Sequence, residues 1–185
     1  MTEKTFVLLK PDAVKRGLVG KIIKTFEQAG LNIIALKMVK PTPELVFKHY
    51  PETNEWFSIL GGKTLDGYAE YRLDVKKELG TDDKVEIGKM IKKWLIEYLT
   101  SGSVVAMVLE GNRAIKNVRR LCGNTLPLFA DPGSIRGKLS IDSSDRANAE
   151  KRPVYNLIHA SGEPDEAKYE IELWFPELAE KILPK

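Results

Sequence analysis

The stretch SVVAMVLEG, residues 103–111, decides the fold that we expect for this chain. Its apolar residues follow one another without a polar interruption, over a length typical of a buried strand. The stretch TFVLLK, residues 5–10, is a second short apolar run, and Pro11 ends it because proline cannot donate a hydrogen bond within a central strand. Both runs are therefore interpreted as strands of one sheet.

Patterns around these runs supply the remaining elements. Apolar residues at helical spacing or a capped start predict helices over residues 18–30, 42–50, 90–102, 112–123 and 163–175. Thr42 and Asn112 are the expected N-caps of two of them. Alternating apolar and polar residues predict strands over 31–40 and 138–143. This order predicts an α/β (α+β) fold, a ferredoxin-like βαββαβ single domain with a four-stranded antiparallel sheet and helices on one face.

Two polar stretches fit this core badly, although a length of 185 residues predicts one domain, 1–185. Residues 51–89 are rich in Gly, Lys, Asp and Glu, and residues 143–153 follow the last expected strand. A long irregular stretch inside a compact domain is either functional or an insertion. Both are interpreted as insertions. They either elaborate the surface or, since they flank Tyr50 and His159, form a lid or a subunit contact.

Composition narrows the class of protein. A net charge of +3 does not by itself imply a nucleic-acid or membrane partner. The single cysteine, Cys122, excludes an intramolecular disulfide and indicates a reducing compartment. Two histidines and one cysteine argue against a zinc site. Without a signal-peptide pattern or an apolar window of membrane-spanning length, the expected location is the cytoplasm.

Four residues at the ends of expected elements suit an anionic ligand. Lys10 ends a strand, and Arg119 lies near the end of a helix. Thr125 and Arg136 lie in the turns that follow. Lysine and arginine with a hydroxyl group are typical readers of phosphate oxygens. Any one of them alone could be ordinary surface charge, but together with His159 they indicate a site for an oligophosphate.

His159, in the stretch NLIHASGE at 156–163, has three possible roles: a core imidazole, a general base or a nucleophile. A histidine with a pKa of about 6.5 is largely unprotonated at neutral pH and needs no tuning to act as a nucleophile. Glu170 or Glu172, on the following helix, could accept a hydrogen bond from one ring nitrogen and leave the other free. The second histidine, His49, is expected to be partly exposed beside Tyr50.

The stretch GGKT, residues 61–64, is similar to the end of a phosphate-binding Walker loop. That loop needs a glycine five positions before Gly62, where Phe57 stands, and no clear buried strand precedes it. The sequence therefore argues against a P-loop nucleotidase.

Six ordered stretches together resemble the nucleoside diphosphate kinase family. They are FVLLKPDAVKRGLVGKIIKTFEQAG, KHY, YLTSGSVVAMVLEG, RRLCGNTLP, DPGSIRG and NLIHAS. The resemblance implies reversible transfer of the γ-phosphoryl group from a nucleoside triphosphate, usually ATP, to a nucleoside diphosphate. It also implies a ping-pong mechanism through phosphohistidine at His159. Mg²⁺ would arrive on the nucleotide phosphates rather than on protein ligands, and a homo-oligomer, commonly a hexamer, is expected.

The resemblance also implies roles for individual residues. Lys10 matches a lysine that contacts phosphate and ribose, and Asn156 matches an asparagine that contacts ribose. Tyr50 matches a tyrosine near the catalytic histidine, Glu170 the acid that orients it, and Ser161 the serine that supports the pair. The expected phosphate-binding residues are Arg119, Thr125 and Arg136.

Three departures from the family pattern affect details. Gly162 and Glu163 replace a small residue and an acid that normally follow the serine, so an acid that helps hydrate the metal is moved or lost. Lys138 replaces an acid, and GNTLP replaces GETNP. The aromatic residue that stacks on the base cannot be assigned among Trp56, Phe57 and Ile91, and Pro153 or Val154 is expected on the other side of the base.

Two other classes of function fit the sequence less well. A ferredoxin-like module that binds RNA needs exposed aromatic residues at alternate strand positions, and residues 103–111 and 138–143 contain none. A domain that binds nucleotide without turnover would be expected to lack part of the matched set of site residues, which is complete here.

Overall fold

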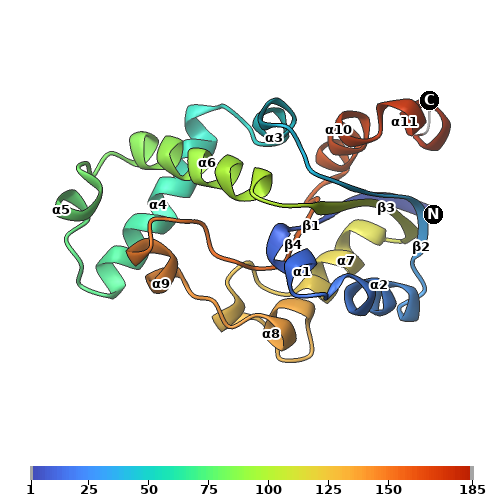
Figure 1. Ribbon diagram of the computed structural model, residues 1–185, viewed down its shortest axis with the longest axis horizontal. Helices are drawn as coiled ribbons and strands as arrows, with labels where there is room; N and C mark the ends of the chain where they lie inside the picture. The colour runs from blue at the N-terminus through green and yellow to red at the C-terminus, as the bar shows by residue number, and fades with distance from the viewer. Residues whose placement is uncertain (1, 184–185) are drawn as a thin grey trace.

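The apolar runs of the sequence form the two central strands of a four-stranded antiparallel sheet (Figure 1). The computed structural model describes residues 2–183. The strands are β1 (Thr2–Leu9), β2 (Asn32–Val39), β3 (Val104–Asn112) and β4 (Ile158–Ala160), in the spatial order β2-β3-β1-β4. The predicted fold class, a mixed α/β fold on an antiparallel sheet, is confirmed.

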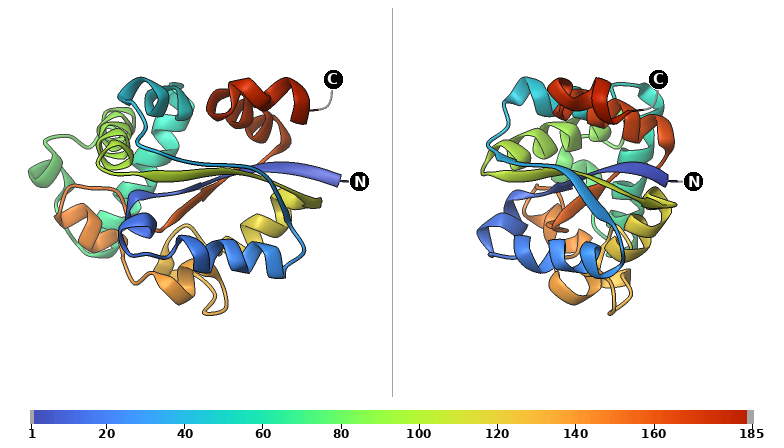
Figure 2. Two further views of the ribbon diagram at one scale, coloured as in Figure 1. Left: turned by 45° about the vertical axis from the view of Figure 1, so that its right-hand side comes forward. Right: turned by 90° about the vertical axis from the view of Figure 1, so that its right-hand side faces the viewer.

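The prediction that helices cover one face of the sheet is wrong. Val7 and Leu9 of β1 point into one core, and Phe6 and Leu8 point into a second core on the opposite face. Because β1 and β3 are apolar at nearly every position, neither face can be left to water. Figure 2 shows the consequence, with α3, α10 and α11 on one side of the sheet and α2, α7 and α8 on the other.

All five expected helices are present. The helices are α1 (Pro11–Lys15), α2 (Val19–Gln28), α3 (Pro43–His49), α4 (Asn54–Glu70), α5 (Val75–Leu79), α6 (Lys84–Thr100), α7 (Ala114–Cys122), the 3₁₀ helix η1 (Pro127–Phe129), α8 (Ile135–Leu139), α9 (Ser144–Ala149), α10 (Pro164–Trp174) and α11 (Pro176–Ile182). Thr42 caps α3 by accepting a hydrogen bond from the Leu45 amide. Asn112 is not the cap of α7, because it ends β3 and Arg113 takes the cap position. Within residues 2–183, no helix is both long and apolar enough to span a membrane.

The strand expected at residues 138–143 does not form. Residues 135–139 belong to α8, and Ile141, which would have been the apolar face of the strand, is 98% exposed. The fourth strand is β4, which pairs with the end of β1 so that Leu8 lies opposite His159. Ile158 and Ala160 are buried by this pairing, whereas at 138–143 Leu139 packs on the core from α8 and Ile141 faces outward.

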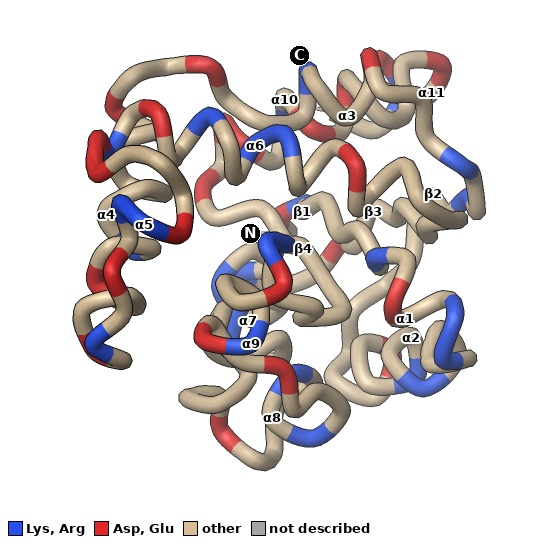
Figure 3. Tube along the Cα trace, turned by 60° about the vertical axis from the view of Figure 1, so that its left-hand side comes forward, with Lys and Arg blue, Asp and Glu red and all other residues tan. Residues whose placement is uncertain are grey.

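The stretch at 51–89 is helical and does not form an irregular loop. It contains α4, α5 and the start of α6, and α4 and α6 lie against each other at one end of the molecule (Figure 1). Residues of both charges lie along α4 and α5, with acids predominating on α4 and lysines on α5 (Figure 3). Gly61 of α4 and Gly88 of α6 let the two backbones approach, because a Cβ at Gly61 would overlap the carbonyl of Lys84 and a Cβ at Gly88 that of Phe57.

Two adjacent glycines of α4 provide a matched test of this crossing. Gly61→Ala is expected to lower the free energy of unfolding by about 1–3 kcal/mol, since the new methyl group meets backbone that cannot rotate away. Gly62→Ala, which meets nothing within 4 Å, should raise it by about 0.5–1 kcal/mol through helix propensity. Urea titration of both variants measures the difference. Equal stabilities would show that the helices do not cross at Gly61.

Candidate active site

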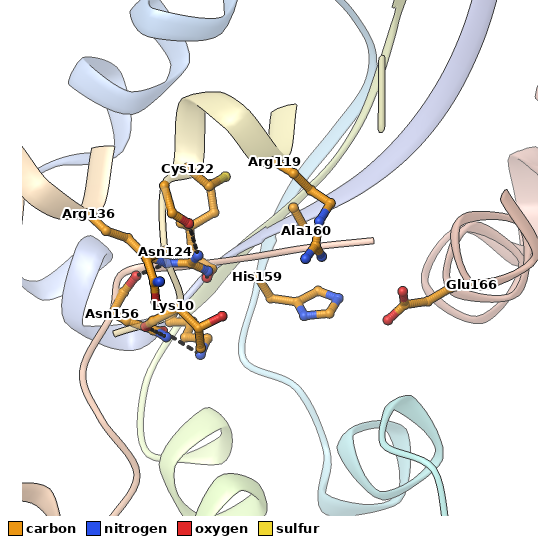
Figure 4. Close-up of a pocket in the computed structure, with 12 residues that line it drawn as sticks. Lys10, Arg119, Cys122, Asn124, Arg136, Asn156, His159, Ala160 and Glu166 are labelled. Atoms are coloured by element: carbon orange, nitrogen blue, oxygen red, sulfur yellow. Dashed lines mark hydrogen bonds between the residues drawn. The ribbon is translucent and has the colours of Figure 1, made fainter. Parts of the chain in front are cut away.

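One pocket of about 360 Å³ gathers six of the residues predicted from the sequence. They are Lys10, Arg119, Thr125, Arg136, Asn156 and His159. Figure 4 shows His159 in the middle, with Lys10 and Asn156 on one side, Glu166 on the other and Arg119 nearby. These residues come from stretches far apart in the chain, and only the packing of the sheet with α7 and α8 brings them together.

The pairing of β4 with β1 places two of these residues side by side. Lys10 directly follows β1, and its backbone amide donates to the carbonyl of Leu157 at 2.9 Å. His159 lies on β4, opposite Leu8. The imidazole and the ammonium group therefore reach the same pocket from neighbouring strands.

His159 is held by a carboxylate behind it. Nε2 of His159 lies 2.6 Å from Oε1 of Glu170, and the Ser161 hydroxyl donates to Oε2 of Glu170 at 2.6 Å. Glu170 is 1% exposed. An ionised carboxylate can only accept, so Nε2 carries the proton and Nδ1 keeps its lone pair. This arrangement leaves Nδ1 available to the pocket.

The charges around the pair keep the imidazole neutral. Burial and the positive charge of Lys10 lower the pKa of His159 to about 3. Burial raises the pKa of Glu170 to about 6, partly offset by His49 and by the hydrogen bond from Ser161. At pH 7 the pair therefore consists of a neutral imidazole and an ionised carboxylate, the combination that a nitrogen nucleophile requires.

His49 is buried at 4% exposure, so the expectation that it is partly exposed is wrong. Its ring meets that of His159 edge-on at 4.7 Å between centroids, and its Nδ1 accepts from the indole nitrogen of Trp174 at 3.3 Å. Burial lowers its pKa to about 3, with His159 as the next cause. The helical spacing from Val46, which faces the core, was the signal that could have placed His49 inside.

Lys10 is a buried lysine whose pKa is lowered by its surroundings. Nζ donates to Oδ1 of Asn156 at 2.7 Å, and the Asn156 amide group donates to the carbonyl of Thr125 at 2.8 Å. Burial, and then the charge of Arg136, lower the pKa of Lys10 to about 8, while Asp12 opposes the shift. An anion bound beside this ammonium group would therefore raise the pKa of Lys10 and favour its charged form.

Arg136 uses three of its nitrogens to hold the pocket wall together. Its guanidinium donates to the carbonyls of Asn156 at 3.2 Å, Gly123 at 2.8 Å and Ile158 at 2.6 Å. It is 8% exposed. Since an arginine carries five N–H groups, two remain to face a ligand in the pocket. Arg136 is therefore both a structural tie and a source of positive charge.

Glu166 is a pocket residue that the sequence reasoning missed. It comes from α10, and its Oε2 accepts from the amide of Gly162 at 2.5 Å. A Cβ at Gly162 would lie 3.0 Å from that oxygen and 3.2 Å from Nη1 of Arg119. The glycine at 162 thus gives space to both side chains. The signal available in the sequence was the loss of side chain at Gly162 next to an acidic first turn of α10.

Tyr50 lies outside this pocket. Its ring meets that of His49 edge-on at 4.9 Å, and it lines a second cavity of about 530 Å³ that shares Glu166 with the first. Trp56 lies 5.9 Å from Tyr50 between ring centroids. The five residues considered for contact with a base are absent from the described lining of the pocket: Trp56, Phe57, Ile91, Pro153 and Val154.

Potential metal ligands are few around the pocket. Among residues 2–183, the one cluster of His, Cys, Asp or Glu groups close enough to share an ion is His49, His159 and Glu170. Nε2 of His159 is already hydrogen-bonded to Glu170, and Nδ1 of His49 accepts from Trp174. The pocket itself has three cations and the carboxylate of Glu166. This donor set suits a metal ion that arrives with its own phosphate ligands better than a protein-bound ion.

Comparison with known proteins agrees with this chemistry. The family model described as "Nucleoside diphosphate kinase" matches residues 3–58 and 84–179. A nucleoside diphosphate kinase of Pyrobaculum aerophilum is 55% identical over 175 residues, covering 95% of this chain and 96% of the relative. One from Methanocaldococcus jannaschii is 37% identical over 177 residues, covering 96% of each.

Solved structures give the same result. A crystal structure of an NDP kinase from Pyrobaculum aerophilum has a TM-score of 0.95 and 52% identity, and covers 100% of both chains. A transition state mimic of nucleoside-diphosphate kinase from Borrelia burgdorferi, with bound vanadate and ADP, has a TM-score of 0.75 and 32% identity, covering 100% of this chain and 92% of that chain. Since the family model and these relatives extend over nearly all the elements that build the pocket, the chain belongs to the nucleoside diphosphate kinase family.

Proposed function

We propose that His159 carries the phosphoryl group when this chain transfers the γ-phosphoryl of a nucleoside triphosphate, ATP, to a nucleoside diphosphate. The observation that supports it is a neutral imidazole fixed at Nε2 by Glu170, with Nδ1 facing a pocket that contains three cations. A nitrogen lone pair held among cations is suited to attack a phosphorus atom bearing negative oxygens.

The transfer takes two steps that mirror each other. Nδ1 attacks the γ-phosphorus, a P–N bond forms, and the bond to the bridging oxygen breaks so that the nucleoside diphosphate leaves with that electron pair. A terminal oxygen of the second nucleoside diphosphate then attacks the phosphorus and releases Nδ1. The positive charge that develops on the imidazole is balanced by Glu170, which Ser161 keeps in place.

The cations stabilise the moving group. We assign Arg119 and Arg136, with the Thr125 hydroxyl, to the phosphates, and Lys10 with Asn156 to phosphate and ribose. Tyr50 acts from behind, through its contact with His49. Preorganised donors of this kind are each worth about 3 kcal/mol in such transition states. The divalent ion of the reaction is assigned as Mg²⁺, which would be held by the nucleotide phosphates and water, in a pocket whose lining includes the carboxylate of Glu166.

Labelling tests the proposal directly. Incubation with γ-labelled ATP and Mg²⁺ should place label on the protein through a bond that is labile in acid and stable in base. Addition of an unlabelled nucleoside diphosphate should then remove the label as nucleoside triphosphate. A protein that exchanges phosphate between nucleotides without ever carrying label would contradict a covalent carrier.

The pH dependence follows from two shifted groups. Below about pH 6 Glu170 gains a proton and can no longer accept from Nε2, and above about pH 8 Lys10 loses its charge. The kcat/KM should therefore be highest between these values and fall on both sides. Lys10→Arg should remove the alkaline decline, because arginine stays charged. An alkaline decline still near pH 8 in that variant would assign it to another group.

Assembly and location are also proposals. We infer a homo-oligomer, a hexamer, acting in the cytoplasm on free nucleotides rather than on nucleic acid or at a membrane, with residues 1–185 as one kinase domain carrying insertions at 51–89 and 143–153. Exposed apolar side chains support self-association: Leu36, Met38, Leu128, Phe129 and Ile141. The buried thiol of Cys122 supports a reducing compartment. Analytical ultracentrifugation measures the number of subunits.

A further inference from the structure

The segment that carries Asn156 is tied to the second insertion. The chain runs from α9 back across the molecule to β4 (Figure 1) and passes through residues 152–157. We propose that Arg152 is a positioning residue for nucleotide binding, which holds this segment so that Asn156 meets Lys10. The proposal rests on the proposed function in that Asn156 and Lys10 contact the nucleotide.

Arg152 is the centre of a charged cluster in which it and Asp142 are mostly buried and Glu150 is exposed. Its two terminal nitrogens form a fork on Asp142, at 2.7 and 3.0 Å, and its Nε lies 2.6 Å from Glu150. The side chains of Arg152 and Asp142 are 13% and 10% exposed. The guanidinium also lies 4.1 Å from the ring centroid of Tyr155. Paired at low exposure and in bidentate geometry, these charges form a stiff tie, unlike an exposed ion pair.

The tie fixes the backbone before Asn156, and a separate anchor, Asp12, fixes it after Asn156. Asp142 accepts from the amide of Tyr155 at 2.7 Å, and the Ser140 hydroxyl donates to the carbonyl of Tyr155 at 2.7 Å. On the other side, Asp12 accepts from the amide of Leu157 at 3.1 Å. Leu157 has a φ of 69°, a left-handed conformation that a branched side chain does not adopt without support.

An aromatic stack joins these anchors to Lys10. The ring of Tyr155 stacks on that of Tyr98 at 4.8 Å between centroids, and the Tyr98 hydroxyl donates to Asp12 at 2.5 Å. Nζ of Lys10 lies 6.0 Å from the Tyr98 ring centroid. Arg152, Tyr155, Tyr98 and Lys10 thus form one chain of neighbouring contacts from the second insertion to the pocket.

The histidine does not depend on this tie. His159 is fixed by the pairing of β4 with β1 and by Glu170, and Arg136 holds the carbonyl of Ile158. Loss of Arg152 should therefore release Asn156 and Lys10 from their mutual contact while the phosphoryl acceptor stays in place. Nucleotide affinity should fall more than the rate of the chemical step.

Arg152→Met tests this inference, with Arg146→Met as the matched control. Arg146 pairs with Glu150 in the same insertion, but its side chain is 66% exposed. Arg152→Met is expected to raise the KM for both nucleotides and the Kd for ADP about tenfold, with kcat and single-turnover labelling by saturating ATP within about twofold. Arg152→Lys cannot form the bidentate pair with Asp142, so the KM and the Kd for ADP should rise about threefold. Arg146→Met should match the original protein.

The outcomes separate this inference from the proposed function. An Arg152→Met protein whose KM and ADP affinity stay within about twofold of the original would overturn the positioning role, as would a fall in kcat at unchanged KM. If circular dichroism shows that Arg152→Met does not fold, Asp142→Asn is judged by the same split between KM and kcat. If the original protein takes up no label on His159 but Arg152→Met still loses ADP affinity, the phosphohistidine proposal is wrong and the positioning role of Arg152 stands.

Discussion

Replacement of His159 by asparagine is expected to lower kcat by about 10⁴-fold or more and to abolish labelling by γ-labelled ATP. Asparagine has a similar size and can still accept from a pocket group, but its amide nitrogen has no lone pair free to attack phosphorus. The fold should be kept, because His159 is on a strand whose pairing with β1 uses backbone atoms. Steady-state assays, label counting and thermal unfolding of the purified variant measure the three quantities.

The only other histidine provides the control. His49→Gln removes the ring that lies against His159 and weakens the packing around Glu170, but it leaves Nδ1 of His159 in the pocket. That variant should be slower and should still take up label. If His159→Asn is labelled as strongly as the original protein, the carrier is a different residue and the mechanism proposed for the pocket is wrong.

Arg136→Lys is expected to have the second largest effect, on activity and on stability together. Lysine keeps the charge but cannot reach three carbonyls at once, so kcat/KM should fall about 10²- to 10³-fold. The free energy of unfolding should also fall by about 2–4 kcal/mol, since the part-buried carbonyl of Gly123 and the buried carbonyl of Ile158 lose their donors. Enzyme assays and urea titration of the same preparation measure both.

Arg119→Lys is the matched comparison. Arg119 lines the same pocket, but its residue is exposed, and no hydrogen bond from its guanidinium to the rest of residues 2–183 is present. It should lose activity while its free energy of unfolding changes by no more than about 0.5 kcal/mol. Equal stability losses in the two variants would mean that the carbonyl contacts of Arg136 do not stabilise the pocket wall.

The prediction from sequence was strongest where local pattern and tertiary environment agree. The runs at 5–10 and 103–111 can bury their apolar side chains only inside a sheet. The capped, amphipathic stretches can bury theirs only as helices packed on that sheet. It failed at 138–143, where alternation is present but the strand that pairs with the outer edge of β1 is β4. It also did not identify the helices at 51–89. There α4 and α6 approach closely at Gly61 and Gly88, and no recognisable apolar stripe marks the contact in the sequence.

The candidate site shows the same division. The residue types and their places at element ends were enough to nominate His159, Lys10 and Arg136 as one site. His49 and Glu166 were not found, because their roles depend on which way a helix face turns toward another element. The double use of Arg136, as a tie between carbonyls and as a cation for phosphate, is likewise invisible before the chain is folded.

By itself, the order of residues along this chain determined its secondary structure in outline, its family and the chemistry available to it, because propensity, hydrophobic period and side-chain pKa are local properties. Only the tertiary structure decided that both faces of the sheet are covered, that His159 is neutral and aimed by Glu170, and that the segment of Arg152 and Tyr155 stacks on Tyr98 of α6. Burial and distance between remote residues set these features, and both arise from packing that no single stretch of sequence contains.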